Sequence, residues 1–115
     1  DREGMIVWAE IPYISEHLAN GNENTISQMK ELIIQNYNHP CIVVWGVSNE
    51  ITISGARLKK QMLENHRVLN DLCHELDKTR LTTIAAVSMC KIDSNLRVWK
   101  NTHKIRECFS FNFYI

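Results

Sequence analysis

The sequence predicts an α/β fold in which about four parallel strands alternate with outer helices. Two apolar runs, residues 5–9 and 42–47, are continuous rather than alternating, as is typical of strands buried on both faces of a parallel sheet. Between them, apolar residues recur at three- and four-residue steps, which indicates a helix packed on the outside of the sheet. Polar side chains directly follow both runs, where parallel sheets carry their chemistry.

The first strand is expected over residues 5–9, with Glu10 at its end. After a polar loop, Thr25 and Gln28 have the spacing of a capping box, which predicts that a helix starts there. The apolar stripe of this helix consists of Ile26, Met29, Ile33 and Tyr37.

The second strand follows a helix stop at His39 and Pro40, because the residue before a proline is disfavoured in the α conformation. Residues 42–47 then form the strand. The later elements are expected to be a helix over residues 56–77 with a second face that is charged and solvated, strands over 81–87 and 109–114, and a less regular connection over 93–106.

Composition excludes several classes of function. The 13 basic and 13 acidic residues cancel and form no block of like charge, which argues against a nucleic acid or an anionic membrane as partner. No apolar run approaches the roughly 20 residues of a membrane-spanning helix. We therefore expect a cytoplasmic protein with a neutral polar substrate.

The four cysteines are widely spaced and include no C-x-x-C pair, which argues against a zinc ribbon or a dense disulfide scaffold. Reduced and mostly buried thiols are expected. Cys73 and His74 are adjacent on the predicted helix and so point in different directions, which argues against a metal site there.

Asn49 and Glu50 are the candidate site residues that the pattern itself indicates. They end an apolar strand, and such a position would place an amide and a carboxyl group at the mouth of a barrel. Partial burial there disfavours the carboxylate anion, as a proton donor requires. The structural alternatives are a Glu that caps a helix or pairs with an Arg, and an Asn in a strained turn.

Three segments together resemble the catalytic (β/α)8 barrel of glycoside hydrolase family 2. They are DREGMIVWAEIP at the amino terminus, the HP and VVWGVSNE motifs of residues 39–50, and DKTRLTTIA at residues 77–85. The family includes β-galactosidases, β-glucuronidases and β-mannosidases, and the flanking residues are most similar to the β-galactosidase branch. A complete TIM barrel needs about 250 residues, so the 115 residues here are interpreted as about half of one, a single domain incomplete at both ends.

The resemblance implies a role for each candidate. Glu50 would be the catalytic acid/base of a retaining β-glycosidase, and Asn49 would contact the hydroxyl at carbon 2 of the sugar. Glu10 would line the pocket one strand earlier. Asn112 and Tyr114 would bind substrate, although Cys108, Phe109 and Ser110 replace residues that are common in the family.

The nucleophilic Glu of the family would lie beyond the last strand of this chain, so the isolated chain is expected to be inactive. The resemblance implies no organic cofactor. Magnesium binds near the acid/base in some β-galactosidases, but no pattern around Glu10 supports it, and we expect no metal.

Three alternatives stay open. The chain could act as a non-catalytic half-barrel whose exposed strand edges self-associate into a homo-oligomer. It could instead have another family 2 activity, that of a β-glucuronidase or a β-mannosidase. It could also be part of a different α/β-barrel hydrolase that uses the Asn-Glu pair in another way.

Overall fold

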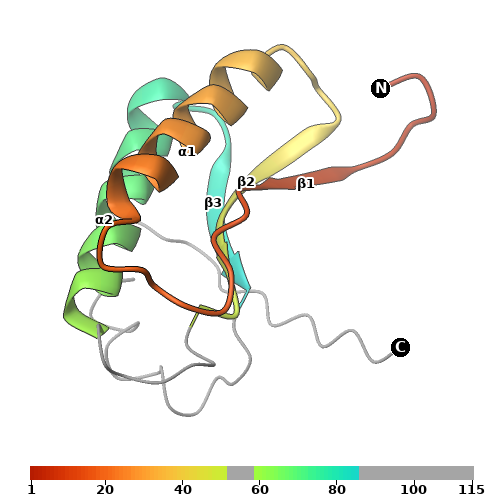
Figure 1. The fold of residues 1–115 in the computed structure, drawn as a ribbon. Coiled ribbons are helices and arrows are strands. Elements are labelled where there is room, and N and C mark those ends of the chain that lie inside the picture. Colours follow the sequence, from red (N-terminus) through yellow and green to blue (C-terminus); the bar gives the residue numbers. More distant parts are fainter. Residues whose placement is uncertain (52–58, 86–115) are drawn as a thin grey trace, which may run out of the picture.

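The structure is a computed structural model that describes residues 1–51 and 59–85. Strands and helices alternate along this part of the chain (Figure 1). The order is β1 (Val7–Glu10), α1 (Asn22–Asn36), β2 (Ile42–Asn49), α2 (Lys59–Leu76) and β3 (Leu81–Ala85). The predicted α/β class and partial TIM barrel are confirmed. The strand predicted over residues 109–114 and the connection over 93–106 lie outside the described residues.

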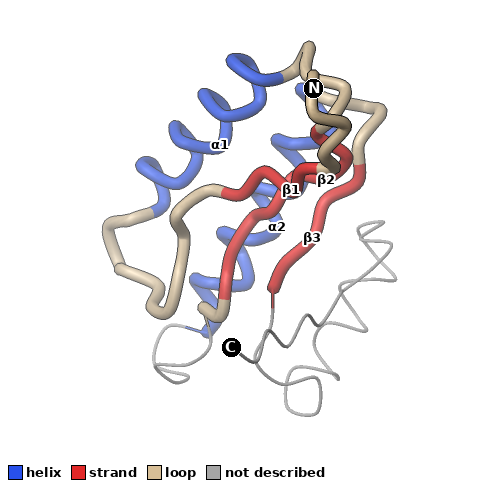
Figure 2. Tube along the Cα trace, turned by 90° about the vertical axis from the view of Figure 1, so that its right-hand side faces the viewer, coloured by secondary structure: helices blue, strands red, loops and turns tan. Residues whose placement is uncertain are grey.

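The three strands form one parallel sheet in the order β1-β2-β3, and both helices cover the same face of it (Figures 1 and 2). The register pairs Glu10 of β1 with Gly46 of β2, and Asn49 of β2 with Ala85 of β3. Because all strands run in one direction, their carboxyl ends lie at one rim of the sheet. This rim therefore carries the predicted site residues of β1 and β2.

β1 begins later than the apolar run predicted. Met5 and Ile6 are 65% and 78% exposed, and pairing with β2 begins where the Val7 amide donates to the Cys41 carbonyl at 2.8 Å. The strand then includes Glu10. Hydrophobicity marked the strand, but the hydrogen-bonded partner set its bounds.

The predicted capping box of the first helix is wrong. α1 starts at Asn22, three residues before Thr25, and its N-cap Gly21 makes no side-chain cap. Thr25 lies inside the first turn and is buried, where its hydroxyl donates to the Asn22 carbonyl at 2.8 Å and accepts from Asn65 Nδ2 at 3.0 Å. A contact with α2 therefore holds this side chain.

The core lies between the helices and the sheet, and the predicted apolar stripes form it. Its fully buried apolar residues are Met29, Ile33, Trp45, Val47, Leu69 and Cys73. The charged face predicted for α2 is present in its exposed Glu64, Arg67 and Asp71. However, α2 also buries Asn65, His66 and Asn70, which the prediction did not anticipate. Among the described helices, none is both long and apolar enough to cross a membrane.

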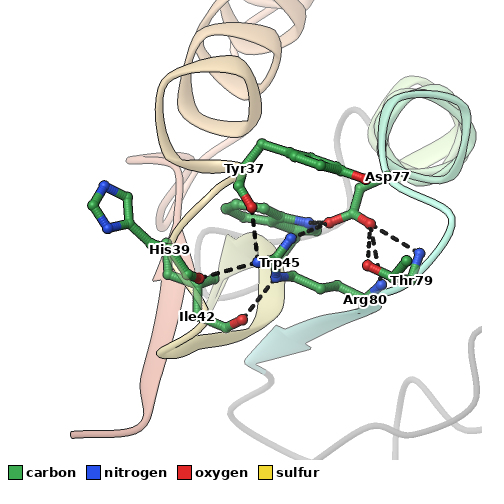
Figure 3. Close-up of polar contacts among 7 residues, drawn as sticks. All are labelled: Tyr37, His39, Ile42, Trp45, Asp77, Thr79 and Arg80. Carbon is green, nitrogen blue, oxygen red and sulfur yellow. Dashed lines mark hydrogen bonds and ion pairs between the residues drawn. The ribbon is translucent and has the colours of Figure 1, made fainter. Parts of the chain in front are cut away.

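A buried acid anchors the rim opposite the predicted site (Figure 3). Asp77 follows α2 and accepts hydrogen bonds from Trp45 Nε1 at 3.0 Å, Thr79 Oγ1 at 2.6 Å and Arg80 Nη1 at 2.7 Å. Burial alone would raise the pKa of Asp77, but these hydrogen bonds outweigh it and hold the pKa well below its usual range. The carboxylate is therefore ionised and fully partnered.

Arg80 extends this anchor to the segment between α1 and β2. Its guanidinium donates to the main-chain carbonyls of Tyr37 at 2.9 Å, His39 at 3.0 Å and Ile42 at 2.7 Å. It also lies over the Trp45 ring, 5.3 Å from the centroid. One side chain thus joins the end of α1 and the beginnings of β2 and β3.

Candidate active site

Asn49 and Glu50 lie at the carboxyl end of β2, where the sequence predicted them, and both are half-buried. On one side, the main-chain N–H of Asn49 donates to the Tyr13 carbonyl at 2.9 Å, and the main-chain carbonyl of Asn49 accepts from the main-chain N–H of Ser15 at 3.2 Å. On the other side, the Glu50 amide donates to the Ala85 carbonyl at 2.9 Å. The loop after β1 and the end of β3 therefore hold the backbone of the pair from both sides.

Glu50 adopts a left-handed backbone conformation with φ of 48°. A residue with a Cβ adopts this conformation at a cost of order 1–3 kcal/mol, and such residues cluster at functional sites. The hydrogen bond to Ala85 stabilises the turn that requires it. The strained residue is the same Glu that the sequence singled out for catalysis.

Glu10 lies at the same rim as Glu50, at the end of β1. Its Oε2 accepts from Trp8 Nε1 at 3.1 Å. Burial raises the pKa of Glu10, and the Trp8 hydrogen bond only partly opposes this. A Cβ on Gly46 would lie 2.3 Å from Trp8 Nε1 and 2.7 Å from the Glu10 Cβ and Cγ, so glycine is required for both side chains to lie over β2.

A buried polar cluster adjoins Asn49 through its neighbour Ser48 and through the Tyr13 carbonyl, and it consists of Tyr13, His17, Ser48, Asn65 and His66. Ser48 Oγ is 2.6 Å from His66 Nε2, and the Tyr13 hydroxyl is hydrogen-bonded to His17 Nδ1. The Tyr13 ring centroid is 5.4 Å from that of His66 and 5.9 Å from that of His17. The cluster thus joins the loop after β1, the end of β2 and α2.

Sequence reasoning missed this cluster. One signal was available, because His66 occupies the apolar stripe of α2 between Met62 and Leu69. A polar residue on such a stripe must find a partner in the core. The partner Ser48, however, could be identified only from the packing.

The cluster predicts a specific pH dependence of stability. Burial lowers the pKa of His66 to about 4, with a smaller opposing effect from its hydrogen bond to the Met62 carbonyl and a further lowering by His17. The ordinary pKa of an unfolded histidine is about 6.5, so between these values the unfolded chain binds more protons than the folded one. The free energy of unfolding should therefore fall by about 3 kcal/mol as the pH decreases through this window. At lower pH, His66 is protonated in both states and contributes no further change.

Urea unfolding of the full-length protein at about pH 7 and about pH 4.5 checks this expectation. His66→Gln should remove most of the difference between the two pH values. The matched control is His39→Gln, because His39 is an exposed histidine outside the buried cluster, where it pairs with Asp1, and the variant should keep most of the difference. An equal pH dependence in all three proteins would contradict the assignment.

The remaining site predictions are not reached by the structure. Asn112 and Tyr114 lie outside the described residues. Within residues 1–51 and 59–85, no group of three or more His, Cys, Asp or Glu side chains is arranged to hold a metal ion. Cys41 and Cys73 are free thiols, and burial raises the pKa of Cys73 to about 12, which makes it a poor nucleophile.

Comparison with known families identifies the class of protein to which this chain belongs. Residues 1–108 match the family described as glycosyl hydrolases family 2, TIM barrel domain. The chain belongs to glycoside hydrolase family 2. This family 2 chain is an α/β unit of a glycoside hydrolase TIM barrel.

The chain is similar to relatives that are named for two different activities. A β-glucuronidase of Bacteroides fragilis is 37% identical in an alignment of 95 residues that covers 75% of this chain and 13% of that protein. A β-galactosidase of Thermoanaerobacter pseudethanolicus is 28% identical in an alignment of 117 positions that covers 100% of this chain and 13% of that protein. The chain thus spans about an eighth of the length of these curated relatives.

Solved structures are also similar. The crystal structure of an FMN-binding β-glucuronidase from Faecalibacterium prausnitzii L2-6 has a TM-score of 0.72 and 49% identity, covering 78% of this chain and 14% of that one. Bacteroides uniformis β-glucuronidase 2, covalently bound to cyclophellitol-6-carboxylate aziridine, has a TM-score of 0.74 and 32% identity, covering 84% of this chain and 13% of that one.

Proposed function

We propose that the chain supplies the acid/base half of a retaining β-glycosidase, with Glu50 as the proton donor and Asn49 as a sugar contact. The observation that carries the proposal is the left-handed Glu50, held at the carboxyl rim of a family 2 barrel by β3 and by the loop after β1. Glu50 would protonate the departing glycosidic oxygen and then activate water, while Asn49 would hydrogen-bond the sugar at carbon 2.

The nucleophile of this reaction is proposed to lie elsewhere in the full protein. A retaining enzyme needs a second carboxylate roughly 5 Å from the acid/base. The covalent complex described for B. uniformis β-glucuronidase 2 supports a covalent mechanism in a relative. With one carboxylate of the pair, the isolated chain would be inactive.

The sugar is proposed to be β-linked glucuronic acid or galactose. The sequence pattern favoured the β-galactosidase branch. Relatives named β-glucuronidase are 37% and 49% identical to the chain, whereas the T. pseudethanolicus β-galactosidase is 28% identical. A structure described as a putative β-galactosidase from Bacteroides fragilis is also 37% identical, so both sugars stay proposed substrates.

No cofactor is part of the proposed reaction, because two carboxyl groups perform the hydrolysis without a redox step. The F. prausnitzii relative is described as FMN-binding. If the full protein also holds FMN, we expect its removal to leave the hydrolytic turnover unchanged.

A panel of nitrophenyl β-glycosides tests the proposal on the full-length protein. Hydrolysis of the β-glucuronide or the β-galactoside, with retained anomeric configuration in the first product, is the expected result. Inversion of configuration, or turnover of neither substrate, would contradict it. Preference between the two sugars decides the finer assignment.

A second proposal concerns the chain in isolation, where we expect self-association. Among the described strands, β1 and β3 each have one edge without a strand partner, and Met5, Ile6, Val43 and Leu81 are exposed. Light scattering of the isolated chain should therefore give the mass of a homodimer or larger assembly. A monodisperse monomer would contradict this expectation.

A further inference from the structure

The hydrogen bond between Ser48 and His66 lies immediately behind the proposed acid/base and has no part in the chemistry proposed above. His66 Nδ1 is 2.8 Å from the Met62 carbonyl, which can only accept. Nδ1 therefore carries the proton, and in the neutral ring Nε2 is the acceptor. It follows that the Ser48 hydroxyl donates to Nε2, at 2.6 Å.

This arrangement attaches the end of β2 to a rigid support. The His66 ring is oriented by the backbone of its own helix, through the Met62 carbonyl one turn earlier. His66 is 3% exposed and Ser48 is 1% exposed, so water does not compete for the bond. Removal of the bond would therefore cost a buried polar interaction that water does not replace.

Ser48 lies in an irregularity of β2 that redirects the residues after it. Gly46 pairs with Thr83, whereas Asn49 pairs with Ala85, so three steps along β2 match two along β3. An extra residue of this kind bends the strand and changes the direction of the following side chains. Asn49 and Glu50 are those following residues.

Tyr13, in the loop after β1, also holds the end of β2. The Tyr13 ring packs against the rings of His66 and His17, and the Tyr13 carbonyl accepts a hydrogen bond from the Asn49 main-chain N–H. The contacts of Ser48 and Tyr13 therefore converge on the backbone of Asn49 from two elements.

We propose that the Ser48–His66 hydrogen bond is a positioning device, which sets the direction in which Asn49 and Glu50 leave β2. Ser48 and His66 touch neither the substrate nor the reacting atoms in this assignment. They act through the backbone of the residues that do. The inference rests on the proposed role of Glu50 as acid/base.

The test uses Ser48→Ala in the full-length enzyme with two aryl glycosides of the same sugar, one with a poor and one with a good leaving group. A displaced acid harms mainly the substrate that needs protonation. We expect kcat/KM for the poor leaving group to fall by about tenfold to a hundredfold, and much less for the good one. A loss of folded enzyme would instead lower both rates by the same factor.

Thr82→Val is the matched control. Thr82 is a buried strand residue whose hydroxyl is 2.6 Å from Asn70 Oδ1 of α2, but it lies near the beginning of β3, away from the site rim. This variant removes a similar hydrogen bond between strand and helix, and should leave the ratio of the two rates at the wild-type value.

Variants of His66 complete the test. His66→Gln offers an acceptor oxygen to Ser48 and should keep a rate ratio closer to wild type than His66→Leu, which offers none. A proportional loss for both substrates, or no loss, in Ser48→Ala would overturn the inference. If the loss of kcat/KM depends on the leaving group in Glu50→Gln but not in Ser48→Ala, only the positioning role fails. If the loss depends on the leaving group in neither variant, the proposed function fails as well.

Discussion

Glu50→Gln in the full-length enzyme should lower kcat/KM for a glycoside with a poor leaving group by about 10²- to 10⁴-fold, the contribution of a general acid. Gln keeps the size and one carbonyl oxygen of the side chain, but it cannot deliver the proton. A glycoside with a good leaving group needs little protonation, so its rate of bond cleavage should change far less. The measurement is the pair of rates on the two substrates.

A second readout separates the acid role from the base role. With the activated substrate, the glycosyl intermediate should accumulate in Glu50→Gln, because the same residue must next activate water. A small anion such as azide needs no general base and should restore turnover. Glu16→Gln is the control, since Glu16 is exposed in the loop after β1. Wild-type rates on both substrates in Glu50→Gln would rule out the assignment.

Arg80→Ala should destabilise the protein by about 3–5 kcal/mol, the cost of leaving a buried charge without its partner. Asp77 is fully buried, and Arg80 is its charged partner at 2.7 Å. The guanidinium also satisfies carbonyl groups of Tyr37, His39 and Ile42. Urea unfolding of the full-length enzyme measures the loss. Arg80→Lys should fall between the wild type and Arg80→Ala, because an ammonium group cannot reproduce the planar fork.

Arg67→Ala is the matched control for this prediction. Arg67 also pairs with two acids on α2, Glu64 and Asp71, but its side chain is 40% exposed. Its removal should cost less than about 1 kcal/mol, because solvent already screens such pairs. Equal losses in the two variants would contradict the prediction. The folded fraction of Arg80→Ala should keep normal kinetics, since the anchor lies at the rim opposite Glu50.

Periodicity and local breaks accounted for the order of the elements. The continuous runs before Glu10 and Asn49 marked β1 and β2, and His39-Pro40 marked the end of the intervening helix. The Thr25 prediction was wrong for an instructive reason. A capping pattern describes a free helix end, whereas the hydroxyl of Thr25 here bonds to Asn65, 40 residues later in the chain.

The features of the candidate site were also only partly predictable from the sequence. The position of Asn49 and Glu50 at a strand end followed from the sequence, because the end of an apolar run is a local property. The left-handed turn at Glu50 and the extra residue in β2 did not follow, because the pairing with β3 creates both.

By itself, the sequence determined that this chain is an α/β unit of a family 2 barrel with an Asn-Glu pair at a strand end. Only the tertiary structure decided which groups hold that pair and which hold the opposite rim, namely Ser48 with His66 and Asp77 with Arg80. The reason is physical. Burial patterns repeat along the chain and can be read from it, whereas a hydrogen-bond partner such as His66 for Ser48 depends on how packed elements meet in space.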